Sequence, residues 1–194
     1  MEITSVQLKE LRDLTGISVM QCKKALEEAG GDMDKAKIIL QKKGGEIALK
    51  KSDRELGAGA IGSYVHSTHE VAALVHLACE TDFVAKNEAF IALARDIAMH
   101  VAAQDPLYVS RDQVDESALA KAREVFMEEV KDKPADMQEK ILTGKLDAYF
   151  KDRILIEQPF IKDQDKTIGN LIDSATQKFG ERIVISAISR ISVK

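Results

Sequence analysis

The sequence predicts an α+β fold, in which a small helical bundle precedes a core of antiparallel sheet, helices and a helical hairpin. Capped segments with helical periodicity fill the first 45 residues. After a glycine-rich stretch the apolar period becomes extended, and the last dozen or so residues alternate as a strand does. We therefore expect a three-helix module over 1–45, a linker over 46–56 and an α+β core over 57–194.

Each helix expected in the first module begins at a capping residue and ends at glycine. The N-caps are Thr4, Ser18 and Asp32, and the first two are followed three residues later by glutamine, as in a capping box. The expected stops are Gly16, Gly30-Gly31 and Gly44-Gly45. Three helices of about ten residues bury little apolar surface, so the module should have a thin core.

The core should open with a β-hairpin. Gly57, Gly59 and Gly62 are expected to mark the domain boundary. Residues 61–66 and 71–77 then form two strands around a turn at residues 67–70. A third strand is expected at the end of the chain, with its apolar residues on one half-buried face: Ile183, Ile185, Ala187, Ile191 and Val193.

The other core elements are expected to be mostly helical. An amphipathic helix over 88–103 should end at Asp105-Pro106. Two charged segments, 115–132 and 135–151, are broken at Lys133-Pro134 and so predict a helical hairpin, with a solvated structural arm as its default role. After a short extended piece over 154–161, Thr167 should cap a helix that ends at Gly180.

Composition restricts the classes of function. The chain has 194 residues, of which 45% are apolar and 31% charged, which is typical of a folded protein. A net charge of −4, with 28 basic residues interleaved among 32 acidic ones, argues against nucleic acid as a direct ligand. No apolar run approaches the roughly 18 residues of a membrane span. Two cysteines, and no signal or transit pattern, lead us to expect the bacterial cytoplasm.

The segment that follows the second strand is the most informative one. Asp82 and Phe83 lie side by side between that strand and the helix that begins near residue 88. Connecting loops held by a rigid scaffold often carry function, so this pair predicts an apolar and anionic wedge presented to a partner. Two plainer explanations stay open at this point. Asp82 could cap the following helix, and Phe83 could lie in the core.

Zinc chemistry is the best catalytic candidate, and the spacing disfavours it. His66, His69, His76 and Cys79 are suitable ligand types. However, His76 and Cys79 would point to opposite faces of a strand, because side chains alternate with period two. We therefore favour hairpin histidines and a buried thiol, with no metal.

Other enzyme signatures are weaker still. The glycines of 57–62 lack the Gly-Lys-Ser/Thr ending of a phosphate loop, and a strand follows them where a helix is required. Glu80 and Asp82 have no evident acid–base partner, and no nucleophile elbow is present. The sequence favours a protein-binding surface over an enzyme.

Several segments in the same order resemble the translation elongation factor Ts family, and together they cover essentially the whole chain. They are 6–16, 20–26, 79–87, 97–103 and 158–160. The resemblance implies a guanine-nucleotide exchange factor for the GTPase elongation factor Tu, without a cofactor, metal or small-molecule substrate of its own. It also implies that the first module is of ubiquitin-associated type.

The resemblance further implies which residues contact the GTPase. Thr81, Asp82, Phe83 and Val84 match a wedge that enters between helices of the partner beside its Mg²⁺ site, which promotes GDP release and GTP reloading. Arg12 and Met20 match bundle positions that contact the GTPase domain, and His66 matches a position close to the partner. The pair Lys50-Lys51 matches a feature of the family's linker.

The chain has room for one core, as in short family members that pair into dimers. In some of these a cysteine near the terminal strand links the dimer, whereas this chain has Ser189 in the corresponding stretch. We therefore expect a non-covalent homodimer. Two alternatives stay open: a ubiquitin-associated-like adaptor without exchange activity, and a small zinc-dependent enzyme.

Overall fold

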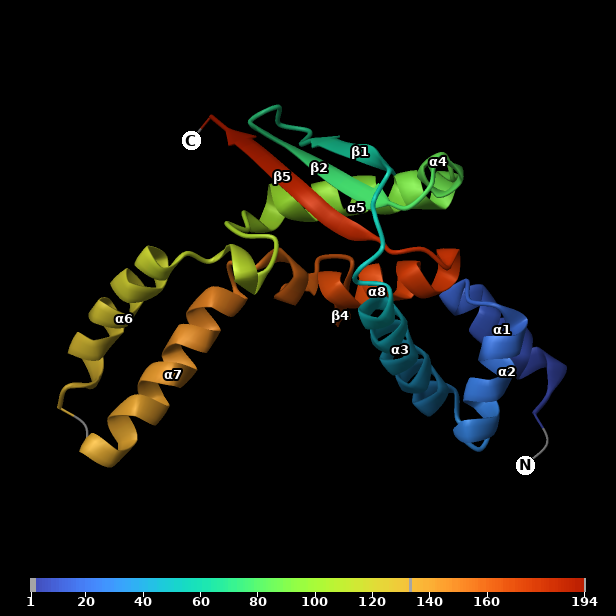
Figure 1. Cartoon of the computed structure of the whole chain (residues 1–194), viewed down its shortest axis with the longest axis horizontal. Coiled ribbons are helices and arrows are strands. Elements are labelled where there is room, and N and C mark those ends of the chain that lie inside the picture. The colour runs from blue at the N-terminus through green and yellow to red at the C-terminus, as the bar shows by residue number, and fades with distance from the viewer. Residues whose placement is uncertain (1–2, 133, 194) are drawn as a thin grey trace.

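The computed structural model describes residues 3–132 and 134–193, and it has the mixed α+β fold that the sequence predicts (Figure 1). The helices are α1 (Ser5–Thr15), α2 (Val19–Glu28), α3 (Met33–Lys50), α4 (Asp82–Ala85), α5 (Glu88–Gln104), α6 (Glu116–Val130), α7 (Ala135–Lys151) and α8 (Ile168–Phe179). The strands are β1 (Ala58–Val65), β2 (Val71–Cys79), β3 (Pro159–Phe160), β4 (Asp163–Thr167) and β5 (Val184–Ser192). Short 3₁₀ turns occupy Arg111–Gln113 and Leu155–Glu157, so part of the piece expected to be extended is helical.

The N-terminal bundle has the three helices and the caps that the sequence predicts. Thr4 and Gln7 form a complete capping box, and Gly16 ends α1 in the left-handed conformation with a φ of 67°. Leu11, Leu26 and Leu40, one from each helix, are buried together in a small core. The bundle therefore has the thin interior expected of three short helices.

The third helix is longer than predicted, because Gly44 and Gly45 do not end it. Helix α3 continues to Lys50, so the first residues of the expected linker are helical. A Cβ atom at Gly44 would lie 3.2 Å from the backbone oxygen of Asp173 in α8. These glycines thus let α3 cross close to α8, and packing between helices outweighs the usual preference of glycine for a helix end.

The main sheet is antiparallel with the strand order β1-β2-β5. The predicted turn at 67–70 joins β1 to β2, but β1 begins at Ala58, so Gly59 and Gly62 lie inside the strand and not at a boundary. A Cβ atom at Gly62 would lie 2.1 Å from the backbone oxygen of Ala94 in α5. Gly62 is thus needed where the strand crosses the helix.

The terminal strand is present, but its predicted face changes partway along. The pairing of β2 with β5 shifts between His76 and Leu77, where Ser186 is inserted as a β-bulge. Ile185 before the bulge is buried, whereas Ile191 after it is 69% exposed. The expectation that Ile183, Ile185, Ala187, Ile191 and Val193 share one face is therefore wrong, because one extra residue reverses the alternation.

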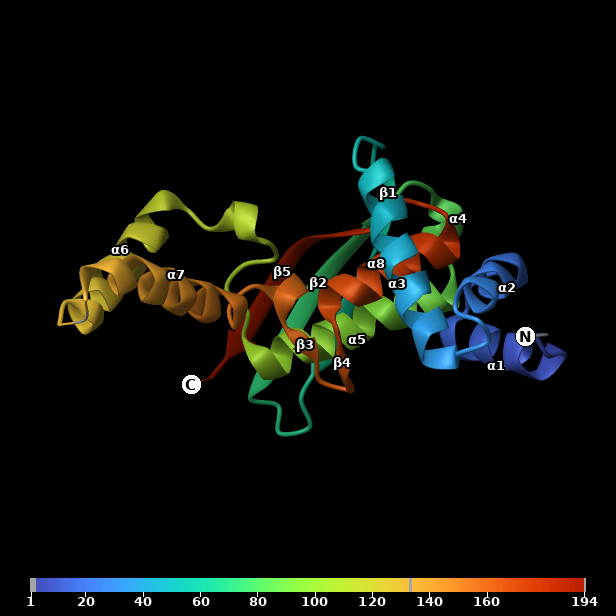
Figure 2. The ribbon, with the colours of Figure 1, turned by 90° about the horizontal axis from the view of Figure 1, so that it is seen from below.

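Helices α5 and α8 lie on the same side of the main sheet (Figure 1), and the largest core lies between the sheet and these helices. Phe90 of α5 meets Phe179 of α8 edge to face, with ring centroids 5.9 Å apart. The helical hairpin α6–α7 and the N-terminal bundle extend from opposite ends of this core (Figure 2). Within the described ranges, no helix combines the length and apolar character needed to cross a bilayer.

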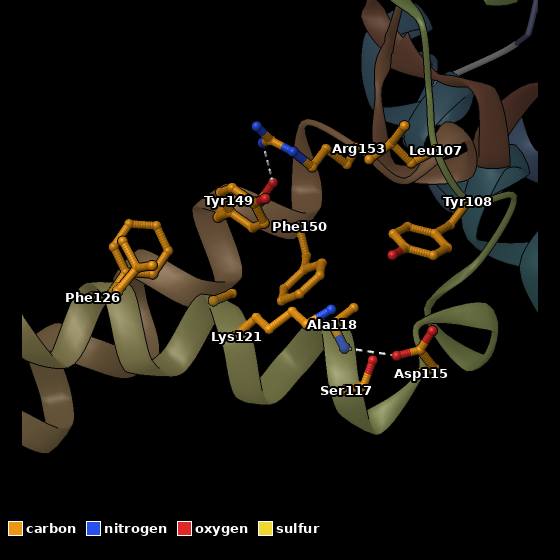
Figure 3. A pocket seen from close by; sticks show the side chains of 12 residues that line it. Leu107, Tyr108, Asp115, Ser117, Ala118, Lys121, Phe126, Tyr149, Phe150 and Arg153 are labelled. Atoms are coloured by element: carbon orange, nitrogen blue, oxygen red, sulfur yellow. Dashed lines mark hydrogen bonds between the residues drawn. The ribbon is translucent and has the colours of Figure 1, made fainter.

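The helical hairpin, called the arm below, is present as predicted, although Lys133 at its break lies outside the described residues. A hollow of about 380 Å³ lies where the arm joins the core. Tyr108 and Phe150 lie on opposite sides of it, with the Tyr108 hydroxyl directed toward Phe150 (Figure 3). The guanidinium of Arg153 lies 3.7 Å from the centre of the Tyr149 ring. The two ends of the arm are joined by backbone hydrogen bonds, because the N–H groups of Leu107 and Tyr108 both donate to the carbonyl oxygen of Arg153.

A buried polar contact joins α5 to the segment before β3. His100 is fully buried, and its Nε2 lies 2.9 Å from Oε1 of Gln158. The backbone N–H of Ile161 donates to Nδ1 of the same ring. A neutral imidazole protonated at Nε2 satisfies both contacts, whereas an imidazolium would lose the second one. Two of the segments that resemble the family, 97–103 and 158–160, thus meet inside the core.

We expect this buried histidine to make the fold sensitive to mild acid. Burial lowers the pKa of His100 below its ordinary value of 6.5, so the unfolded chain binds more protons than the folded one near that pH. The stability that the neutral ring provides is present above pH 6.5 and is lost as the pH falls through that value. One such group changes the free energy of unfolding by at most about 1.4 kcal/mol per pH unit.

Thermal unfolding at pH 7.5 and pH 5.5 tests this expectation. The wild-type chain should lose more stability between the two pH values than His100→Gln, which carries an amide that does not titrate. Equal losses in the two proteins would show that protonation of His100 does not contribute.

Candidate functional site

The segment expected to be a loop contains a short helix. Strand β2 ends at Cys79, residues 80 and 81 turn, and α4 occupies Asp82–Ala85 before Asn87 caps α5. Thr81 is the N-cap residue of α4, so Asp82 does not cap a helix and lies in its first turn. A helix of one turn is not stable alone, so contacts with the core must hold it.

One side of α4 is anchored and the other is open to solvent. Val84 is buried in the main core. The neighbouring Phe83 is 81% exposed, the highest exposed fraction among the large apolar side chains of the described residues. The explanation that Phe83 belongs to the core is therefore wrong. Exposing a phenyl ring is unfavourable in an isolated chain, so the ring is suited to burial against another molecule.

Asp82 adds a negative charge beside this ring. Its carboxylate pairs with Nζ of Lys86 one turn later, at 2.6 Å, and both side chains are largely exposed. The hydrogen bond from Lys86 and the charge of the ammonium group hold the pKa of Asp82 below its ordinary value, so the carboxylate is ionised at neutral pH. Residues 81–84, called the wedge below, thus present an aromatic ring and an anion from a helix held against the core. Val84, which was also predicted to contact the partner, is instead buried and anchors this helix.

A polar network holds the turn in front of α4. The carboxylate of Glu181 accepts hydrogen bonds from the backbone N–H groups of Glu80 and Thr81 and from the Thr81 hydroxyl. Glu80 in turn accepts from the backbone N–H of Arg182 and pairs with Arg54. Burial opposes ionisation of Glu80, but these two partners lower its pKa overall. No local pattern in the sequence indicates this network, because Glu181 lies about a hundred residues from its partners.

The other predicted contact residues lie on separate surfaces. Arg12 and Met20 are exposed on the N-terminal bundle, where Met20 is 69% exposed. His66 is exposed at the turn of the β1–β2 hairpin, where its Nδ1 lies 3.0 Å from the Thr68 hydroxyl. Because α4 follows the other end of β2, His66 and the wedge lie at opposite ends of the same hairpin (Figure 1).

The structure does not bring the candidate zinc ligands together. Cys79 is fully buried in the core, and burial raises the pKa of its thiol. His76 pairs with Ile61 on the outer face of the sheet, while His66 and His69 lie at the hairpin turn. Over residues 3–132 and 134–193, no group of three or more histidine, cysteine or acidic side chains is arranged to hold a metal ion.

Known proteins resemble this chain over nearly its full length. The family model described as Elongation factor TS matches residues 9–193. A protein named Elongation factor Ts from Thermosipho melanesiensis is 46% identical over 193 residues, which cover 98% of each chain. Proteins of the same name from Thermodesulfovibrio yellowstonii and Leptospira biflexa are 44% and 46% identical, and the matches cover all of this chain and 97% and 98% of theirs.

Proposed function

This chain belongs to the elongation factor Ts family of translation elongation factors, and from that premise we propose that it exchanges guanine nucleotide on the GTPase elongation factor Tu. The observation that most supports this proposal is the exposed Phe83 ring beside the ionised Asp82 on an anchored helical turn. The chain binds the GDP form of the GTPase, promotes GDP release and leaves the nucleotide site free for GTP.

We propose that the wedge acts on the Mg²⁺ site of the GTPase. Mg²⁺ is the largest local charge that holds the nucleotide phosphates, so a change in its coordination weakens nucleotide binding more than most other changes. Phe83 enters between helices of the partner and fixes the position of the carboxylate of Asp82. Val84 and the turn before α4 keep the ring and the carboxylate in one orientation while the helices of the GTPase move apart.

Lowering the barrier to GDP release requires more binding free energy than the wedge alone can supply. A thousandfold faster release corresponds to a barrier lowered by about 4 kcal/mol. An interface of about 1,600 Å² can provide this much binding free energy beyond the cost of association, whereas one ring and one carboxylate cannot. We therefore propose that Arg12 and Met20 of the bundle, and His66 of the hairpin, also contact the GTPase. The two binding equilibria are coupled reciprocally, so the factor by which this chain lowers the affinity for nucleotide is also the factor by which bound nucleotide lowers the affinity for this chain.

Release of fluorescently labelled GDP from elongation factor Tu tests the proposal. The release rate should rise with the concentration of this chain and reach a plateau. An adaptor without exchange activity would bind the GTPase, as a pull-down or calorimetry would show, but would leave the release rate at its spontaneous value. That outcome would exclude the exchange function and leave the family assignment standing.

The outer face of the sheet supports the proposed homodimer. Three rows of cross-strand partners in β1, β2 and β5 lie on this face: Val65–Ala72–Ile191, Ser63–Leu74–Ser189 and Ile61–His76–Ala187. Ile61 and Ile191 are more than 60% exposed, and in the described part of the chain no helix covers this side of the sheet (Figure 1). Two such faces could pack against each other as a sandwich, with no need for a disulfide at Ser189.

Such a dimer would also help His66 and the wedge to act together. Along one hairpin the eight residues of β1 separate them by roughly 26 Å, at about 3.3 Å per residue. An antiparallel pairing of two sheets would place the hairpin turn of one protomer near the wedge of the other. A single GTPase could then contact both.

Ile191→Lys should separate the dimer. Ile191 lies in the apolar row Val65–Ala72–Ile191 of the proposed interface, and a lysine buried there without a partner is strongly unfavourable. Light scattering should show twice the chain mass for the wild type and one chain mass for Ile191→Lys at the same concentration. The matched control is Val125→Lys, because Val125 is a similarly exposed apolar residue on the arm. A monomeric wild type would contradict the proposed assembly.

A further inference from the structure

We propose that Glu181 is a positioning residue that sets the orientation of the wedge. The geometry points to a reciprocal contact, called the clasp below, between the turn at residues 80–81 and the turn at residues 181–182. This inference rests on the proposed exchange function for its effect on activity. The contact itself can be tested on the isolated chain.

In the first half of the clasp, the Glu181 carboxylate is bound by one short stretch of chain. Its Oε2 accepts from the backbone N–H groups of Glu80 at 3.1 Å and Thr81 at 3.0 Å. Its Oε1 accepts from the Thr81 hydroxyl at 2.5 Å. Hydrogen bonds to an ionised carboxylate are about twice as strong as neutral ones, so three of them restrict the turn firmly.

The second half of the clasp runs in the opposite direction. The Glu80 carboxylate accepts from the backbone N–H of Arg182 at 2.6 Å and pairs with Nη1 of Arg54 at 3.0 Å. Arg182 donates from its Nη1 to the backbone oxygen of Arg54 at 2.6 Å. The segment that leads from the N-terminal bundle, the turn after β2 and the turn after α8 therefore meet at one point.

Thr81 connects the clasp to the wedge. A threonine at an N-cap position normally uses its hydroxyl to cap the helix, but no side chain caps α4, because this hydroxyl is bound to Glu181. The backbone oxygen of Thr81 accepts from the Sγ of Cys79 and from the N–H of Ala85 in α4. All the polar groups of Thr81 are thus engaged, and they define where the first turn of α4 begins.

The consequence is a division of tasks around α4. Val84 holds the helix against the core by apolar contact, which does not specify its direction, whereas the clasp fixes its first residue by directed hydrogen bonds. Without Glu181, Phe83 would still be exposed and present, but its ring would sample several directions. A ring that samples several directions must be ordered again on contact with the partner, and this ordering uses part of the binding free energy that would otherwise drive GDP release.

The test compares Glu181→Ala with Glu181→Gln in the labelled-GDP assay. The alanine removes all three acceptor contacts, and we expect the plateau release rate to fall at least tenfold while the half-saturating concentration changes less than threefold. The glutamine can accept from the two backbone N–H groups and donate to the Thr81 hydroxyl oxygen, so it should restore the plateau to within about threefold of the wild type. Glu128→Ala, at an exposed acid on the arm, is the matched control.

Hydrogen exchange on the isolated chain separates this inference from the proposed function. The amides of residues 80, 81 and 85 should exchange faster in Glu181→Ala than in the wild type or Glu181→Gln, whether or not the chain acts on the GTPase. Equal exchange rates would overturn the positioning role. An active wild type whose Glu181→Ala variant reaches the same plateau would also overturn it, whereas an inactive wild type would overturn the exchange function alone.

Discussion

Replacing Phe83 by alanine is expected to lower the efficiency of stimulated GDP release by about 30-fold or more, which corresponds to about 2 kcal/mol, the usual threshold for a residue that dominates an interface. The reason is that the ring is the large apolar anchor of the proposed contact with the GTPase. The free energy of unfolding should change by less than about 0.5 kcal/mol, because the ring is 81% exposed and leaves no cavity when it is removed.

Both quantities must be measured on the same protein. Release of labelled GDP gives the exchange efficiency, and urea denaturation gives the free energy of unfolding. Val125→Ala removes an exposed apolar side chain from the arm and should leave exchange near the wild-type value. If Phe83→Ala stimulates GDP release from the GTPase as strongly as the wild type does, the assignment of the wedge is wrong, even though the family assignment stands.

Gly62→Ala is expected to have the largest effect on stability, a loss of about 3 kcal/mol or more. The added Cβ would lie 2.1 Å from the backbone oxygen of Ala94 and 2.2 Å from its carbonyl carbon. These are backbone atoms of α5 and cannot rotate away as a side chain can. Strand β1 would therefore have to move off the helix, which opens the core beneath the sheet.

Gly144→Ala provides the opposite case within the same chain. Gly144 lies in α7, and a Cβ there would meet no atom within 4 Å. Alanine favours a helix over glycine by up to about 1 kcal/mol, so this variant should be slightly more stable than the wild type. Denaturant unfolding of both variants and of the wild type measures these changes in the free energy of unfolding. A Gly62→Ala protein as stable as Gly144→Ala would mean that β1 and α5 are not in close contact.

Local signals in the sequence predicted most of the fold. The capping residues Thr4, Asp32 and Thr167 each begin a helix, because a cap acts through hydrogen bonds within one turn. The β1–β2 hairpin and the arm were also predicted, since they join neighbouring segments. The errors have a different origin. Gly44 lies inside α3 because of a contact with α8, and Ser186 forms a bulge opposite β2.

In the candidate site, too, the sequence indicates what depends on neighbouring residues and misses what depends on contacts between distant segments. The sequence singled out Asp82 and Phe83 as a candidate site, because an acid and a ring in a connection between elements are conspicuous locally. It could not show that the ring is exposed, which depends on how Val84 packs in the core. It also could not show that Glu181 holds Thr81, because no pattern links residues so far apart in the chain.

The central claim, that the wedge accelerates GDP release by disturbing Mg²⁺ in elongation factor Tu, is tested most directly by measuring the acceleration with and without the metal. The ratio of stimulated to spontaneous GDP release should be large in excess Mg²⁺ and clearly smaller in EDTA, where the metal is already gone and the spontaneous rate is higher. The same ratio under both conditions would contradict the account, because the chain would then release GDP by a route in which Mg²⁺ plays no part.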